Sequence, residues 1–441
     1  MKSKYVKHFS LDLKPNGGFL ITKSLGYQSL FLLLIISFNT NAQIVYNNGA
    51  VIAIKAGANM IVKTGSFTNA SGTVDNAGLL QVEGNYTNNA TSNGGGAAGV
   101  YKIQNNWVNN ATFTANNSQV ELYGANQLIT GTSSTNFYQL TLTGTGIKTQ
   151  TLDASVSNLL ELNDRELATD NFKMIITNTN VNAITRTTGF VSSLGNGRLS
   201  RAMSSVGTYL FSTGSSVGVT RYRPITITPS TSTAQQYEVR LANNDPNTDG
   251  FNRNTKAADV CEVNPNYFHH INKISGTSPV SLSFYYDALL DGNWASVGHW
   301  QNIPQWQNTG IVVPGVAAPF TTLTIASWSD FNLSPFALVN LGPNANITGS
   351  TSFCVGASTT INFTGTPNAV ITYNINGGPT LNLTLNGSGS ASINTGALGT
   401  TTVYNLLSAY MPATPSCVQN FTAQATVTVI PIPLITPIFH D

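Results

Sequence analysis

Three stretches of the chain repeat one another: Gly65-Ser66-Phe67-Thr68-Asn69, Gly84-Asn85-Tyr86-Thr87-Asn88 and Asn105-Asn106-Trp107-Val108-Asn109. The aromatic residue at position 67 recurs at position 86 and again at position 107. A repeat of about 20 residues is typical of stacked structural units. The stretches between the aromatics alternate in polarity and are broken by Gly and Asn, which predicts strands joined by tight corners. Each repeat therefore has the length of one coil of a parallel β-helix, with aromatic and aliphatic residues stacked inside and Asn residues laddered at the turns.

The composition indicates an all-β protein of low charge. Only 20 Lys+Arg and 18 Asp+Glu occur in 441 residues, which is 9% of the chain, and the net charge is +2. A soluble domain usually has about a quarter of its residues charged. Because the net charge is close to zero and gives no strongly positive surface, binding to nucleic acid is not expected. Asn, Thr, Ser and Gly replace the missing charges, and these residues favour strands and turns.

The remaining domains follow from changes in pattern. Residues 43–185 form the predicted solenoid, for which an antiparallel sandwich or meander is the alternative. Residues 186–340 lose the repeat and gain Tyr, Arg, Trp and Pro, and their strand-like runs predict a central antiparallel β-sandwich. Residues 341–433 have the size and strand spacing of an immunoglobulin-like sandwich. Residues 434–441 are expected to be a linker or a truncated end.

Residues 1–42 predict a secretory signal peptide. The apolar run Leu30–Ile36 follows a Lys-rich region and precedes small residues, with cleavage expected after Ala42. The run is about half as long as a membrane span requires, so no transmembrane segment is expected after cleavage, and an uncleaved anchor is the alternative. We therefore expect a protein that is secreted or exposed at the outer cell surface.

The chain has three cysteines, and in the oxidising surroundings of an exported protein cysteines can form disulfides. Cys354 and Cys417 are the predicted disulfide, which would close a loop of about 64 residues and stabilise the fold by roughly 4 kcal/mol. Cys261 is then left as a buried and inert thiol, because neither a Cys-x-x-Cys spacing nor a neighbouring base activates it.

Several motifs of the central region resemble a known family: Gly197-Arg198-Leu199-Ser200-Arg201, Tyr209-Leu210-Phe211-Ser212-Thr213-Gly214, Tyr222-Arg223-Pro224 and Asp330-Phe331-Asn332-Leu333-Ser334-Pro335-Phe336. They resemble the recurring core of large extracellular proteins of Bacteroidetes, of the gliding-motility and type IX secretion kind. That family usually has Phe-Pro-Val-Gly where this chain has Phe211-Ser212-Thr213-Gly214.

The segment from Asn344 to Pro433, with Cys354-Val355-Gly356 and Cys417, resembles the PKD-type or immunoglobulin-like repeats of the same proteins. The resemblance implies a multidomain surface protein without catalytic residues to carry over. It also implies a sorting domain of about 80 residues, which does not occur before Asp441, so the means of surface attachment is not predicted.

The solenoid has few groups that could perform catalysis. Polysaccharide lyases and glycosidases of this shape use paired carboxylates. Here the acidic cluster is Glu161, Asp164, Glu166 and Asp170 around Arg165, and its spacing predicts one long solvated turn. No catalytic residues are therefore assigned.

Other candidate sites have a structural explanation as well as a functional one. Asp245, Asn247 and Asp249 have calcium-loop spacing, but Lys256 replaces the bidentate Glu, which favours an Asx turn. His269 and His270 would face opposite sides of a strand and cannot chelate one ion together, so no metal or cofactor is expected.

Trp294, Trp300 and Trp306 recur every six residues. On an extended strand that spacing places them in one row, which could stack on sugar rings. Packing in a sandwich core is the alternative that we favour.

These observations predict a secreted structural or adhesive protein that contacts glycans or other cell-surface proteins weakly and in many places. A carbohydrate-active β-helix enzyme and a glycan-binding accessory protein are the alternatives.

Overall fold

The computed structural model describes residues 19–21, 43–95, 98–332 and 335–432. Most of the expected signal peptide, and residues 434–441, lie outside this part of the chain. The described chain is all-β, as predicted, apart from the short helix α1 (Ala288–Asp291) and the 3-10 helix η1 (Pro246–Asp249). It divides into two compact units. The first comprises Met1–Asp249, Pro265–Asn293 and Ile311–Phe336, and the second comprises Gly250–Asn264, Trp294–Gly310 and Ala337–Asp441.

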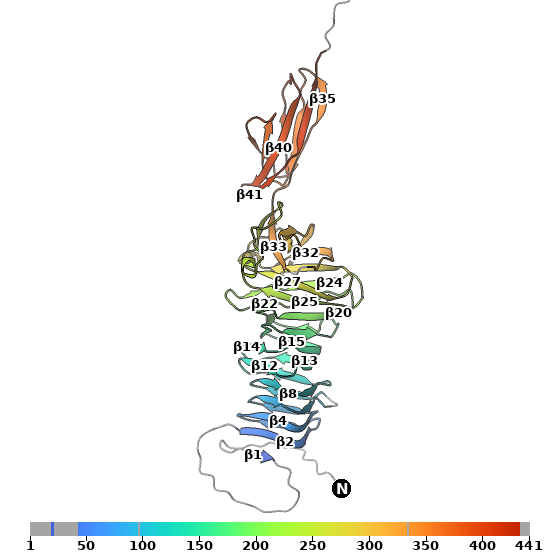
Figure 1. Cartoon of the computed structure of the whole chain (residues 1–441), viewed down its shortest axis with the longest axis vertical. Coiled ribbons are helices and arrows are strands. Elements are labelled where there is room, and N and C mark those ends of the chain that lie inside the picture. The colour runs from blue at the N-terminus through green and yellow to red at the C-terminus, as the bar shows by residue number, and fades with distance from the viewer. Residues whose placement is uncertain (1–18, 22–42, 96–97, 333–334, 433–441) are drawn as a thin grey trace, which may run out of the picture. The chain divides into compact units, whose positions relative to one another are not determined.

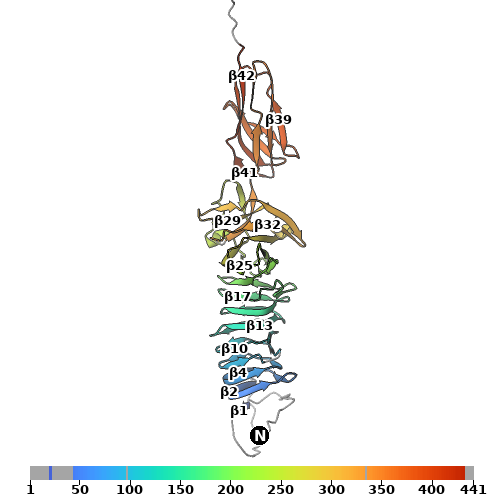
Figure 2. The ribbon, with the colours of Figure 1, turned by 90° about the vertical axis from the view of Figure 1, so that its right-hand side faces the viewer.

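The first unit begins with the predicted parallel solenoid, whose coils lie one upon another in both views (Figures 1 and 2). One wall consists of β1 (Phe19–Ile21), β2 (Gln43–Ile54), β4 (Gly65–Asn76), β6 (Tyr86–Asn88), β9 (Trp107–Asn109), β12 (Gln127–Gly131), β14 (Ile147–Gln150), β16 (Glu166–Ala168) and β19 (Phe190–Ser192), with β7 (Thr91–Asn93) and β10 (Thr112–Thr114) beside it. The other wall consists of β3 (Asn59–Val62), β5 (Leu79–Val82), β8 (Val100–Ile103), β11 (Gln119–Leu122), β13 (Thr135–Leu142), β15 (Ala154–Glu161), β17 (Lys173–Ile176), β18 (Ile184–Thr185) and β20 (Arg198–Met203). All these pairings are parallel, so the antiparallel alternative is wrong for this region.

The quoted repeats stack in register inside the solenoid. The rings of Phe67, Tyr86 and Trp107 are fully buried, with centroid separations of 5.6 and 4.8 Å and interplanar angles of 14° and 23°. Such offset stacking adds to the stability gained by burying the rings. At the corner, a Cβ on Gly84 would lie 2.3 Å from the carbonyl oxygen of Gly65 in the coil below. A glycine is therefore required at this corner, because any side chain would collide with the coil below.

A second ladder runs beside the aromatic rings and confirms the predicted Asn stacking. Asn47, Asn69, Asn88 and Asn109 are buried, and the Nδ2 of each donates to the Oδ1 of the next over 2.8, 3.1 and 2.9 Å. An amide carries both a donor and an acceptor, so identical side chains satisfy one another in a stack. The repeat thus supplies its own buried hydrogen bonds.

Antiparallel strands then extend the wall that ends in β20. These strands are β25 (Gln235–Ala242) and β27 (Phe268–Ser275). A second, separate sheet comprises β21 (Tyr209–Phe211), β24 (Ile225–Pro229), β28 (Val280–Tyr286), β32 (Phe320–Trp328) and β31 (Val312–Ala317). The short hairpin β22 (Gly214–Ser215) and β23 (Arg221–Tyr222) lies outside both sheets. The ring of Phe284 packs between those of His269 and Phe336 at 5.7 and 5.8 Å, so the two sheets face each other.

The second unit contains a two-sheet sandwich. One sheet is β34 (Ala345–Thr348), β36 (Thr360–Gly365) and β39 (Ser390–Asn394), and the other is β35 (Thr351–Cys354), β42 (Gln424–Ile430), β40 (Thr402–Met411), β37 (Val370–Ile375), β38 (Leu381–Thr384) and β41 (Thr414–Asn420). Its core includes Phe363 and Tyr373 from facing sheets, with ring centroids 5.1 Å apart. The unit also holds β26 (Val260–Val263), β29 (Ser296–Trp300), β30 (Trp306–Asn308) and most of β33 (Pro335–Leu341).

The disulfide prediction was wrong in one partner. Cys417 in β41 is bonded to Cys261 in β26, with Cα atoms 5.3 Å apart, and Cys354 is an exposed free thiol. Cys354 lies beside Ile430 of β42, which pairs with residues 402–405 of β40, whereas Cys417 lies in β41, which pairs with residues 408–411 at the other end of β40. The two predicted partners therefore lie toward opposite ends of the sheet. Disulfides of this kind form in oxidising compartments.

Candidate functional site

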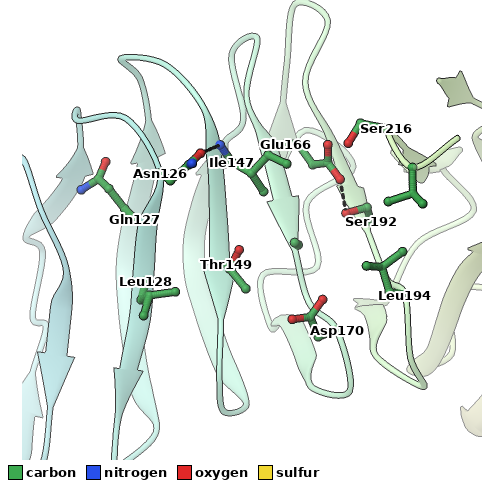
Figure 3. A pocket seen from close by; sticks show the side chains of 12 residues that line it. Asn126, Gln127, Leu128, Ile147, Thr149, Glu166, Asp170, Ser192, Leu194 and Ser216 are labelled. Atoms are coloured by element: carbon green, nitrogen blue, oxygen red, sulfur yellow. Dashed lines mark hydrogen bonds between the residues drawn. The ribbon is translucent and has the colours of Figure 1, made fainter. Parts of the chain in front are cut away.

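A groove of about 420 Å³ lies on the outer surface of the first solenoid wall (Figure 3). Its floor comes from outward positions of four adjacent strands, where Leu128, Thr149, Ala168 and Ser192 are aligned in register. Side chains in a strand alternate between faces, so these residues point outward while their neighbours form the core. The groove therefore follows directly from the stacking of the coils.

The groove combines apolar surface with hydrogen-bond acceptors. Leu194 and Val217 at its border are 62% and 53% exposed. The Oγ of Ser192 donates to Glu166 over 2.5 Å, and Figure 3 shows Asp170 well away from this pair. Among the twelve lining residues, all of them described, there is no basic, histidine or thiol side chain. This lining suits neutral hydroxylated ligands better than anions.

Lys148 lies behind the groove, inside the solenoid, although it is charged. Its side chain is buried, and Nζ donates to the carbonyl oxygens of Gly124, Ala125 and Thr145 over 2.8, 2.6 and 3.0 Å. Burial lowers the pKa of Lys148 to about 8, with a smaller contribution from Arg165. The lysine thus closes a corner of the coil, a role that the residues around it did not predict.

The acidic cluster is not the single long turn that its spacing predicted. Glu161 ends β15 in one wall, where it accepts hydrogen bonds from Gln139 (2.9 Å) and Thr141 (2.6 Å), whereas Glu166 begins β16 in the other wall. Asp164 pairs with Arg165 at the corner between these strands. The tight corner therefore separates the carboxylates onto two faces.

The segment with calcium-loop spacing forms an Asx turn. The Oδ1 of Asp245 accepts from the backbone N–H of Asn247 over 2.9 Å as η1 begins. Asp249 accepts from Asn244 Nδ2 over 2.8 Å and lies 3.9 Å from Arg240. These contacts orient the side chains within the turn itself. Across the described residues, no group of three His, Cys, Asp or Glu side chains is arranged to hold a metal ion.

The tryptophans are buried, which supports the core packing that we favour for them over a glycan contact. Trp294 and Trp300 are 8% exposed and Trp306 is fully buried. The chain reverses after β29, which sets Trp300 opposite Trp306 in a hairpin with ring centroids 5.5 Å apart. An even spacing places side chains in one row only if they belong to one continuous strand. The turn between β29 and β30 puts Trp300 and Trp306 on different strands, so the three tryptophans do not form such a row.

The antiparallel part of the first unit contains a buried ionic network that the sequence did not reveal. Asp291, whose carboxylate is fully buried, accepts from Arg223 in a bidentate contact and from the hydroxyl of Tyr267 over 3.1 Å. Arg221 lies 3.6 Å from the same carboxylate. One ring nitrogen of His269 is 2.8 Å from the carbonyl oxygen of Arg223, and burial lowers the pKa of His269 to about 4. The network is closed to solvent, so it fixes the packing of α1.

Comparisons with known proteins found no matching family model, no similar curated protein and no similar solved structure. Within the described part of the chain, no helix has the length and apolar character that crossing a membrane would require.

Proposed function

We propose that the protein is a secreted or cell-surface structural protein, which presents β-rich modules for weak multivalent contacts with glycans or other surface proteins and performs no catalysis. The observation that carries this proposal is the groove of the solenoid wall. It offers Leu128, Thr149 and Leu194 together with neutral hydrogen-bonding groups, and its carboxylate Glu166 is held by Ser192. A shallow surface of this kind binds weakly at one place, and affinity would come from many copies.

Two further observations support export. The disulfide between Cys261 and Cys417 suits an oxidising location. The resemblance of residues 186–340 and of the carboxy-terminal sandwich to Bacteroidetes surface proteins and their PKD-type repeats agrees with the same location and with an adhesin-like role. The alternative is a carbohydrate-active enzyme, for which Glu166 and Asp170 of the groove would be the acid and base candidates.

A glycan array probed with the chain from Gln43 onward tests the binding proposal. Thr149→Arg places a long cation on the groove floor and should reduce array binding at least tenfold. Thr87→Arg is the matched control, because Thr87 is also a half-exposed, outward threonine of the same wall but lies outside the groove. Equal binding by the two variants would refute the groove as the contact surface.

Release of reducing ends from polysaccharides tests the absence of catalysis. We expect no release by the wild-type chain. Release that disappears in Glu166→Gln would overturn the structural interpretation in favour of the enzyme.

A further inference from the structure

Basic side chains form a row across four neighbouring strands of the first unit. Lys173 of β17 is paired with Arg198 of β20, and Arg240 of β25 is paired with His270 of β27. Continuing the antiparallel register of β20 and β25 by one residue sets Arg198 opposite Arg240. The row lies on the face opposite the core, since the neighbouring Leu199 is fully buried on the other side.

The acids near this row do not balance it. Glu238 is bound by Lys173 at 2.8 Å. Asp249 lies 3.9 Å from Arg240, which is beyond hydrogen-bonding distance. Burial, with smaller contributions from Arg198 and Arg240, lowers the pKa of His270 to about 3, so the imidazole is neutral and adds no charge. Three cations therefore face two carboxylates, and Arg198 forms no ion pair with any residue that the structure describes.

The two arginines also have unused donors. The Nη1 of Arg198 and the Nε of Arg240 are buried and have no hydrogen-bond partner within the described part of the chain, and the Arg240 side chain is only 10% exposed. A guanidinium has donors and no acceptor, so neighbouring arginines cannot satisfy each other. Like charges opposite one another in a sheet are destabilising, and a buried unpaired donor adds to that cost. A ligand with several acceptor oxygens and a negative charge would remove both penalties.

We propose that this row, Lys173, Arg198 and Arg240, binds an oxyanion, namely the carboxylate or sulfate group of an acidic glycan. The two guanidinium groups would donate to its oxygens, as they do in bidentate carboxylate and phosphate pairs. Lys173, whose side chain is 42% exposed, marks the side from which the ligand enters. This site is distinct from the groove, and the inference does not depend on the adhesive function proposed above.

Calorimetric titration of the chain from Gln43 onward tests the site. The probes are sodium sulfate, sodium glucuronate and a sulfated disaccharide, with sodium chloride at equal ionic strength as the reference. Arg198→Gln and Arg240→Gln should weaken binding about ten- to hundredfold, the change expected for loss of a charged hydrogen bond. Arg165→Gln is the matched control, because Arg165 pairs with Asp164 at a solenoid corner, and it should bind as the wild type does.

A thermal scan without ligand adds an independent readout. Arg198→Gln should melt at a higher temperature than the wild type, because it removes an unpaired cation, whereas a purely structural arginine would lower the melting temperature. Arg198 has no ion pair to lose among the described residues, whereas Arg240 lies near Asp249, so this variant remains informative if Arg240→Gln does not fold. Binding of sulfate without either sugar ligand would refute the acidic glycan as the source of the anion. No binding, or equal binding by wild type and Arg198→Gln, would overturn the site.

Discussion

Replacing Asn88 by alanine should destabilise the solenoid strongly. In the folded chain the Nδ2 of Asn88 donates to Asn109 Oδ1 and to the carbonyl oxygen of Thr112, both over 2.9 Å, and its Oδ1 accepts from Asn69 Nδ2. Alanine leaves two buried groups without this partner, the Oδ1 of Asn109 and one N–H of Asn69 Nδ2. Each such group costs about 1–3 kcal/mol, so the free energy of unfolding should fall by about 2–6 kcal/mol. Total stabilities are usually about 5–15 kcal/mol, so the loss is readily measured.

The neighbouring residue provides the control for this experiment. Asn89 is exposed and accepts one hydrogen bond, from Asn110 over 2.8 Å, so Asn89→Ala should change the free energy of unfolding by less than about 0.5 kcal/mol. Asn88→Asp keeps the shape but replaces the donors by a buried carboxylate, and it should be at least as damaging as alanine. Urea denaturation followed by circular dichroism measures all three variants. Equal losses for Asn88→Ala and Asn89→Ala would show that the ladder does not stabilise the fold.

Other predictions concern the buried lysine, the cysteines and the core. Burial lowers the pKa of Lys148 from 10.5 to about 8, so the unfolded chain binds more protons than the folded chain between these pH values. The free energy of unfolding of the wild type, relative to that of Lys148→Met, should therefore rise as the pH increases from about 8 to 10.5. Urea denaturation at several pH values measures this difference, and the absence of a rise would contradict the burial of a charged lysine. Maleimide should label Cys354 without reductant, and mass spectrometry should find no labelling in Cys354→Ser because Cys261 and Cys417 are bonded. Trp306→Ala should lower the free energy of unfolding by about 3–5 kcal/mol, measured by the same denaturation, and a smaller loss than about 1 kcal/mol would place the indole outside the core.

The solenoid could be predicted because its signal is local and repeated. Phe67, Tyr86 and Trp107 occur at nearly constant spacing, and a parallel coil converts constant spacing directly into contact. The disulfide could not be predicted in the same way. Cys261 and Cys417 are separated by 156 residues, and their proximity depends on how β26 and β41 are placed by the whole unit.

The candidate sites were only partly predictable for a similar reason. The groove needs outward residues from four coils, and each of them is an ordinary surface residue of its own strand. The tryptophan spacing was misleading because Trp300 and Trp306 lie on different strands of a hairpin. In the sequence, Arg198 and Arg240 are only two members of an Arg-rich region. Their position opposite each other follows from the pairing of β20 with β25, which the sequence alone does not predict.

The Asn ladder and the arginine row show two consequences of the same register. Strand pairing sets like residues beside like in both cases, at Asn69 and Asn88 and at Arg198 and Arg240. An amide has a donor and an acceptor, so each copy completes the next, and the ladder requires nothing from outside. A guanidinium only donates and carries a charge, so each copy repels the next and both need acceptors. The first arrangement stabilises the coil, and the second leaves an unmet requirement that an anionic ligand would meet. Contacts of a neutral ligand at the groove should therefore vary little with salt, whereas contacts of an anion at the arginine row should weaken as salt rises.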